Sequence, residues 1–132
     1  MLNIISNIMP TNFTQAQRTA LLNILQTGKR NAINAERLSL ALGFPAGGNQ
    51  VQTRNLIREC IEVDGDLIGS SLSNPKGFYL IDQTNIRELE SYLDSLENRA
   101  IDILQRRTWL IRNWNNAVPG NPTTKIAKYV KP

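Results

Sequence analysis

The sequence predicts a mainly α-helical protein of the α+β class, with one small β-hairpin and a long C-terminal helix. Three observations support this class. Apolar residues recur at helical spacing in three segments between residues 13 and 65. Two short apolar runs, "LIGSS" and "GFYL", flank the turn-rich connector "LSNPK". Residues 82–115 contain neither proline nor glycine.

The first two helices have recognisable ends. Thr14 is a candidate N-cap for a helix that we expect to stop at Gly28, and Asn34 is a candidate N-cap for a short helix ending at Gly43. Between them, Ile33 either pairs in a brief strand or fills the core.

The third helix carries an apolar stripe and a polar face. Asn49 can cap it, and Gly65 ends it. The polar side chains concentrate in its first turns, where Gln and Asn suit adenine edges and Arg suits guanine edges or phosphate. The alternative is an ordinary solvated face on a helix that packs against the core. The stripe consists of Val51, Leu56, Ile57, Cys60 and Ile61.

Three helices followed at once by a hairpin resemble the winged helix-turn-helix family, as found in small bacterial and bacteriophage proteins. The resemblance covers residues 13–81 and includes the run "TRNLIRECIEVDGDLIGSS" and the later "NPKGFYLI". It implies that the third helix enters the major groove and that the hairpin is the wing. Glu59 and Glu62 are expected to turn toward the flank of that helix. The implied DNA-binding residues are Asn49, Gln50, Gln52, Thr53, Arg54, Arg58 and Lys76.

The long segment at residues 82–115 has a heptad pattern, with apolar residues stepping alternately by three and four and interrupted by Arg107. We expect one continuous helix that pairs with a second copy of the chain. The alternative is a break near "ENRA", with two helices folding back on their own core. Asp82 or Thr84 offers a cap. The expected dimerisation residues are Leu89, Leu93, Leu96, Ile103, Leu110 and Trp114.

Basic residues gather toward the C-terminus. Residues 99–132 hold seven Lys or Arg against one Asp, whereas residues 82–98 hold one against five Asp or Glu. Nucleic acid is a suitable partner for such a region, although basic tails are also commonly solvated. We expect residues 1–12 to be an N-terminal arm outside the folded domain. The tail, residues 116–132, follows a phosphate backbone, docks as a strand on a neighbour, or is disordered.

Composition argues against catalysis and cofactors. The chain has no histidine and a single cysteine, and its carboxylates show no catalytic or metal-ligand spacing. No signal peptide or membrane span is recognisable, so we expect a cytoplasmic protein. The expected function is sequence-specific binding of double-stranded DNA by a dimeric transcriptional regulator of a bacterium or phage. The alternative is a phage or mobile-element accessory protein whose winged helix binds a host protein, for instance a defence or polymerase complex.

Overall fold

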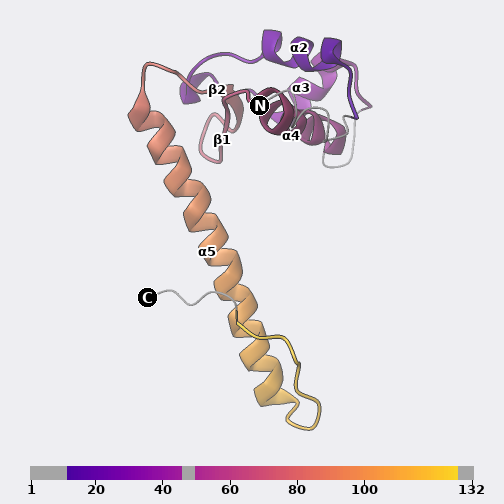
Figure 1. Cartoon of the computed structure of the whole chain (residues 1–132), viewed down its shortest axis with the longest axis vertical. Helices are drawn as coiled ribbons and strands as arrows, with labels where there is room; N and C mark the ends of the chain where they lie inside the picture. Colours follow the sequence, from indigo (N-terminus) through magenta and orange to yellow (C-terminus); the bar gives the residue numbers. More distant parts are fainter. Residues whose placement is uncertain (1–11, 46–49, 128–132) are drawn as a thin grey trace. The chain divides into compact units, whose positions relative to one another are not determined.

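The computed structural model describes residues 12–45 and 50–127 and confirms the α+β class (Figure 1). The chain forms two compact units, one up to Leu89 and the other from Glu90. Helices and strands follow the expected order along the chain. They are α2 (Gln15–Ile24), the 3-10 helix η1 (Lys29–Asn31), α3 (Ala35–Leu42), α4 (Val51–Asp64), β1 (Ile68–Ser71), β2 (Gly77–Leu80) and α5 (Ile86–Ala117).

The first helix begins as predicted and ends earlier than predicted. The Thr14 side chain accepts a hydrogen bond from the Gln17 amide, and the Gln17 side chain accepts one from the Thr14 amide, which completes a capping box. α2 stops at Ile24 because the next residues extend to meet β2. The Gly28 amide donates to the Leu80 carbonyl at 2.9 Å, so the prediction of a helix reaching Gly28 is wrong.

α3 has both predicted ends, α4 has its predicted C-terminal end, and the two helices complete the core. α4 starts directly after Gln50, which makes no side-chain capping bond, so the cap predicted at Asn49 is not the one found. The Asn34 side chain caps α3 by accepting from the Arg37 amide at 2.8 Å, and Gly43 ends it in the left-handed conformation. Gly65 ends α4 in the same way. The core cluster of buried residues draws on all three helices and on β1, and it consists of Leu21, Leu25, Leu38, Leu56, Ile57, Cys60 and Ile68.

The hairpin is antiparallel, with Ile68 opposite Leu80 and Ser71 opposite Gly77. A third segment joins it, because the Ile33 amide and carbonyl both bond to the backbone of Phe78, at 2.9 and 2.8 Å. Both expected roles of Ile33 are therefore met: its backbone pairs, and its side chain packs against the core. Gly77 has φ 137°, and a β-carbon there would collide with the Ile33 carbonyl.

α5 is one uninterrupted helix of 32 residues, which confirms the expected long helix and rules out the break near "ENRA". At ~1.5 Å per residue it is roughly 48 Å long. Asn85 caps it by accepting from the Glu88 amide, while Asp82 instead accepts from Thr84 in the preceding turn. Every residue of α5 is at least partly exposed. Across the described ranges, no helix combines the length and the apolar character needed to cross a membrane.

Candidate nucleic-acid interface

Three of the predicted DNA-binding residues on α4, Gln52, Arg54 and Arg58, are exposed, and Gln52 lies on the other side of the helix from Arg54. Of the predicted apolar stripe, Leu56, Ile57 and Cys60 are buried in the core, whereas Val51 and Ile61 are exposed. Gln50 precedes the helix in a left-handed conformation, with φ 51°, and is half-buried. Asn49, the other residue predicted at this end, lies outside the described residues.

Thr53 was predicted to contact DNA, and that prediction is wrong. Its side chain is 0% exposed, and its Oγ1 lies 2.6 Å from Ser39 Oγ in a buried hydrogen bond. The bond joins the first turn of α4 to α3. Thr53 therefore positions the helix from within and cannot reach a base edge.

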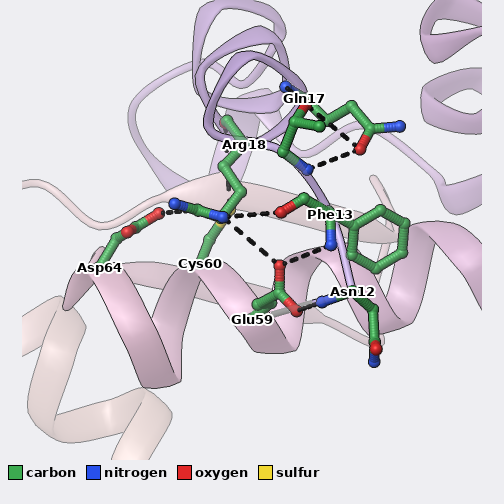
Figure 2. Close-up of polar contacts among 8 residues, drawn as sticks. Asn12, Phe13, Gln17, Arg18, Glu59, Cys60 and Asp64 are labelled. Atoms are coloured by element: carbon green, nitrogen blue, oxygen red, sulfur yellow. Dashed lines mark hydrogen bonds and ion pairs between the residues drawn. The ribbon is translucent and has the colours of Figure 1, made fainter. Parts of the chain in front are cut away.

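Glu59 lies inward rather than beside the arginines. Its carboxylate accepts hydrogen bonds from the Asn12 amide at 2.6 Å and the Phe13 amide at 3.1 Å, and it lies 3.6 Å from the Arg18 guanidinium (Figure 2). With an exposed fraction of 7%, this carboxylate is shielded from a ligand on the outer face of α4. Glu62 remains exposed.

Arg18 of α2 also binds the acidic end of α4. Its Nε donates to Asp64 at 2.7 Å, and its Nη1 donates to the Phe13 carbonyl at 2.9 Å (Figure 2). Two of the three acidic groups of α4 are thus compensated by one arginine from another helix. Apart from the paired Asp64, the exposed charged residues of α4 are one acidic residue, Glu62, and two basic residues, Arg54 and Arg58.

A small group of potential metal ligands lies at the same end. Cys60 Sγ and carboxylate oxygens of Asp64 and Asp66 lie within 4.8 Å of one another, a grouping that the sequence did not reveal. Burial, reinforced by the nearby carboxylates, raises the pKa of the Cys60 thiol to about 12. The thiol is therefore protonated at neutral pH, and Asp64 is already paired with Arg18.

Arg54 connects α4 to the hairpin. Its guanidinium carbon lies 5.7 Å from the centroid of the Phe78 ring on β2, within the range of a cation–π contact. Phe78 is in turn paired with Ile33. The exposed side of α4 and the hairpin are therefore parts of one surface.

Four basic residues surround the tip of the hairpin, and three of them were not predicted. Two neighbouring hollows share Asn74 and Pro75 at the tip. Lys29 and Arg30 line the first hollow, and Arg37 and Lys76 line the second. Asp82 and Glu88 also line the first hollow. Lys76 is exposed where the sequence predicted it. The other three lie before α4 in the chain, and the bridges that Thr27 and Ile33 form with β2 bring them to the hairpin.

The predicted dimerisation residues remain available on α5. Leu89 is half-buried, and the others are exposed, namely Leu93, Leu96, Ile103, Leu110 and Trp114. Part of the basic tail lies against the same helix. Trp114 Nε1 donates to the Asn121 carbonyl at 2.8 Å, and Arg107 donates to the Ile126 carbonyl at 2.7 Å. Lys128 and Lys131 lie outside the described residues.

Comparison of the chain with protein-family models, with curated proteins and with solved structures finds no match.

Proposed function

We propose that this protein is a winged-helix protein that binds double-stranded DNA, and that it acts as a dimeric transcriptional regulator in the cytoplasm of a bacterium, encoded by the bacterium or its phage. The order of elements supports this proposal: helix, short paired segment, helix, helix and antiparallel hairpin. In this proposal α4 is the recognition helix and the β1–β2 hairpin is the wing.

The observation that carries the proposal is the contact between Arg54 and Phe78. A recognition helix and a wing must present side chains to the same duplex, so they need a fixed relation to each other. The Arg54 side chain bridges the two elements while remaining exposed. In the complex, Arg54 binds a phosphate or guanine at the junction of helix and wing.

The distribution of charge on this unit supports the same proposal. Arg58 lies one turn beyond Arg54 on α4, and Glu59, its acidic neighbour in sequence, is buried against the amides of residues 12 and 13. Lys76 and Arg37 flank the wing. In our proposal these cations contact the phosphate backbone and position the polar residues of α4 for base contacts.

Fluorescence anisotropy with labelled duplexes, random and genomic, tests the proposal at two salt concentrations. The decisive variant is Arg54→Ala with Arg58→Ala. The control, Arg87→Ala with Arg112→Ala, removes the same charge from exposed positions on α5. Each lost phosphate contact is expected to lower the slope of log K against log salt by about 1.

We expect the α4 variant to lose most of its affinity and about two units of salt slope, while the α5 variant stays close to the parent protein. Equal affinities for the parent and the α4 variant would contradict the proposal. Absence of binding by the parent at low salt would reject DNA recognition altogether.

A second candidate function is protein recognition by the same unit, as in an accessory protein that inhibits a host complex. The supporting observation is that Leu40 of α3 and Val51 of α4 are exposed, at 62% and 60%. A pull-down from lysate with and without nuclease separates the two candidates. A partner that is retained after nuclease treatment, and lost in Leu40→Ser with Val51→Ser, would favour protein recognition.

A further inference from the structure

The C-terminal half of α5 and the tail that returns along it form an open groove of about 1210 Å³. The helix contributes Ile103, Leu110 and Trp114, which remain 62%, 61% and 47% exposed. Pro122 and Ile126 of the tail line the opposite side. The groove therefore presents exposed apolar side chains within this unit.

The tail is a fixed wall of this groove. Three hydrogen bonds attach it to α5: Trp114 to the Asn121 carbonyl, Arg107 to the Ile126 carbonyl, and the Thr123 amide to the Asn115 side chain at 2.9 Å. The attachments are spread along the helix from residue 107 to residue 115. Two of the donors, Arg107 and Trp114, belong to the heptad seam, so the tail borders the seam. Ile103 and Leu110 of the seam stay exposed beside it.

The charges of the groove have one sign. Arg106, Arg107 and Lys125 line it, and no acidic residue does among the described residues. An occupant that matches both its apolar floor and its charge is an acidic amphipathic helix.

Such a helix exists in the chain itself. Residues 90–98 contain three acidic residues and no basic residue, whereas residues 99–127 contain five basic residues and one acidic residue. Leu93 and Leu96 lie on the same seam as Ile103 and Leu110 and are 51% and 39% exposed. The two halves of α5 thus have complementary charges and a shared apolar stripe. A helix cannot fold back on itself, so the complement must come from a second copy.

We propose that α5 pairs antiparallel with α5 of a second copy, so that the groove of each chain receives residues 90–98 of the other. The contact is reciprocal, as a two-fold axis requires. A parallel pair would instead set the acidic halves against each other and the basic halves against each other. This inference rests on the dimer in the proposed function and is independent of DNA binding.

The heptad seam limits the pair to registers that differ by seven residues, and the placement of residues 90–98 on the groove selects one of them. When Leu93 lies opposite Leu110, the same register sets Leu89 opposite Trp114 and Leu96 opposite Arg107. Arg107, which interrupts the seam within one chain, then lies beside Glu97 of the second copy. The residue that weakens the apolar stripe becomes the one that recognises the acidic half.

Disulfide trapping on the full-length protein distinguishes the two orientations. Leu93→Cys and Leu110→Cys are made as separate variants, mixed in equal amounts and oxidised. The native Cys60 stays in place because it is fully buried. In the antiparallel pair, two copies of residue 93 are about 25 Å apart along the axis at ~1.5 Å per residue, far beyond disulfide reach.

We expect the mixture to form mainly the mixed disulfide between positions 93 and 110, and each variant alone to remain largely unlinked. Homodisulfides from each variant alone would overturn the antiparallel assignment while leaving a dimer. A monomer by light scattering at all concentrations would overturn both the pairing and the proposed dimer. In either case, the anisotropy titration with labelled duplexes still tests DNA binding on its own, because it does not depend on the orientation of the two α5 helices.

Ser91→Cys, on the side of α5 away from the seam, is the matched control and should not cross-link in either orientation. If a substitution at position 93 or 110 disturbs folding, Leu89→Cys with Trp114→Cys supplies a second pair with the same prediction. The pairing should also weaken at high salt, because its specificity comes from charge. Unchanged association of the parent protein in 1 M salt would contradict the role of the basic groove.

Discussion

The side-chain oxygens of Ser39 and Thr53 lie 2.6 Å apart and form a buried hydrogen bond between α3 and α4. Ser39 Oγ also donates to the Ala35 carbonyl at 2.8 Å. Because a hydroxyl has one hydrogen, Thr53 must be the donor to Ser39. The bond holds the first turn of α4 against α3, and Gln52 and Arg54 are exposed on either side of it.

Thr53→Val removes this donor while preserving the shape of the side chain. We expect it to lower the free energy of unfolding by about 1 kcal/mol, the usual value of one buried hydrogen bond. Urea denaturation measures the loss. Below the unfolding transition, the variant should bind duplex DNA like the parent. A loss of affinity without a loss of stability would instead indicate that Thr53 contacts the ligand directly.

Glu59→Gln tests the carboxylate that receives the amides of Asn12 and Phe13. The change removes the charge that strengthens both hydrogen bonds and pairs with Arg18, so we expect a loss of about 2 kcal/mol in the free energy of unfolding. Glu62→Gln, at an exposed position of the same helix, is the control and should change stability by less than about 0.5 kcal/mol. If Glu59→Gln lowered the free energy of unfolding as little as Glu62→Gln does, the Glu59 contacts would contribute nothing to stability.

Gly77→Ala should be strongly destabilising. The residue has φ 137°, and its added methyl group would meet the carbonyl of Ile33, so the strand pairing at Phe78 would have to separate. We expect a loss of about 3 kcal/mol or more by thermal or urea unfolding. At Gly120 a β-carbon meets nothing within 4 Å, so Gly120→Ala should leave stability nearly unchanged. Equal stability of the two variants would contradict the observed pairing of Ile33 with Phe78.

The pH dependence of stability should reveal Asp66. Burial, and secondarily the charge of Asp64, raises the pKa of its carboxyl, and its Oδ2 accepts no hydrogen bond from the described residues. The folded protein therefore holds this proton to higher pH than the unfolded chain does, so the contribution of Asp66 becomes less favourable as pH rises from the unfolded pKa of 3.8 through the folded pKa.

Asp66→Asn removes that titration. We expect the variant to gain stability relative to the parent as pH rises through this window, as measured by urea unfolding between pH 3.5 and pH 7. A constant difference between the two proteins across the range would contradict the raised pKa.

Local rules explain why most of the fold was predictable. The caps at Thr14 and Asn34 and the left-handed glycines at positions 43 and 65 depend on residues within one turn, and all four are where the sequence indicated them. The end of α2 was predicted wrongly because it depends on pairing with Leu80, which is distant in sequence.

The candidate interface was less predictable because exposure is a tertiary property. Thr53 and Arg54 are adjacent and both polar, but only the position of α3 decides that Thr53 is buried. The same limit applies to Lys29, Arg30 and Arg37, because the pairing of Thr27 and Ile33 with β2 brings them beside the hairpin. Glu59 was expected only to turn aside, and its partners lie more than 40 residues earlier in the chain.

The chain has one cysteine, and it is enclosed in the core between α2 and α4. Its thiol, with a pKa of about 12, reacts with a disulfide reagent only after the core opens. The rate of labelling at neutral pH therefore measures how often the native protein opens and how long it stays open. The protein thus contains its own single-site probe of native-state opening, which can be read with and without DNA and without introducing any foreign residue.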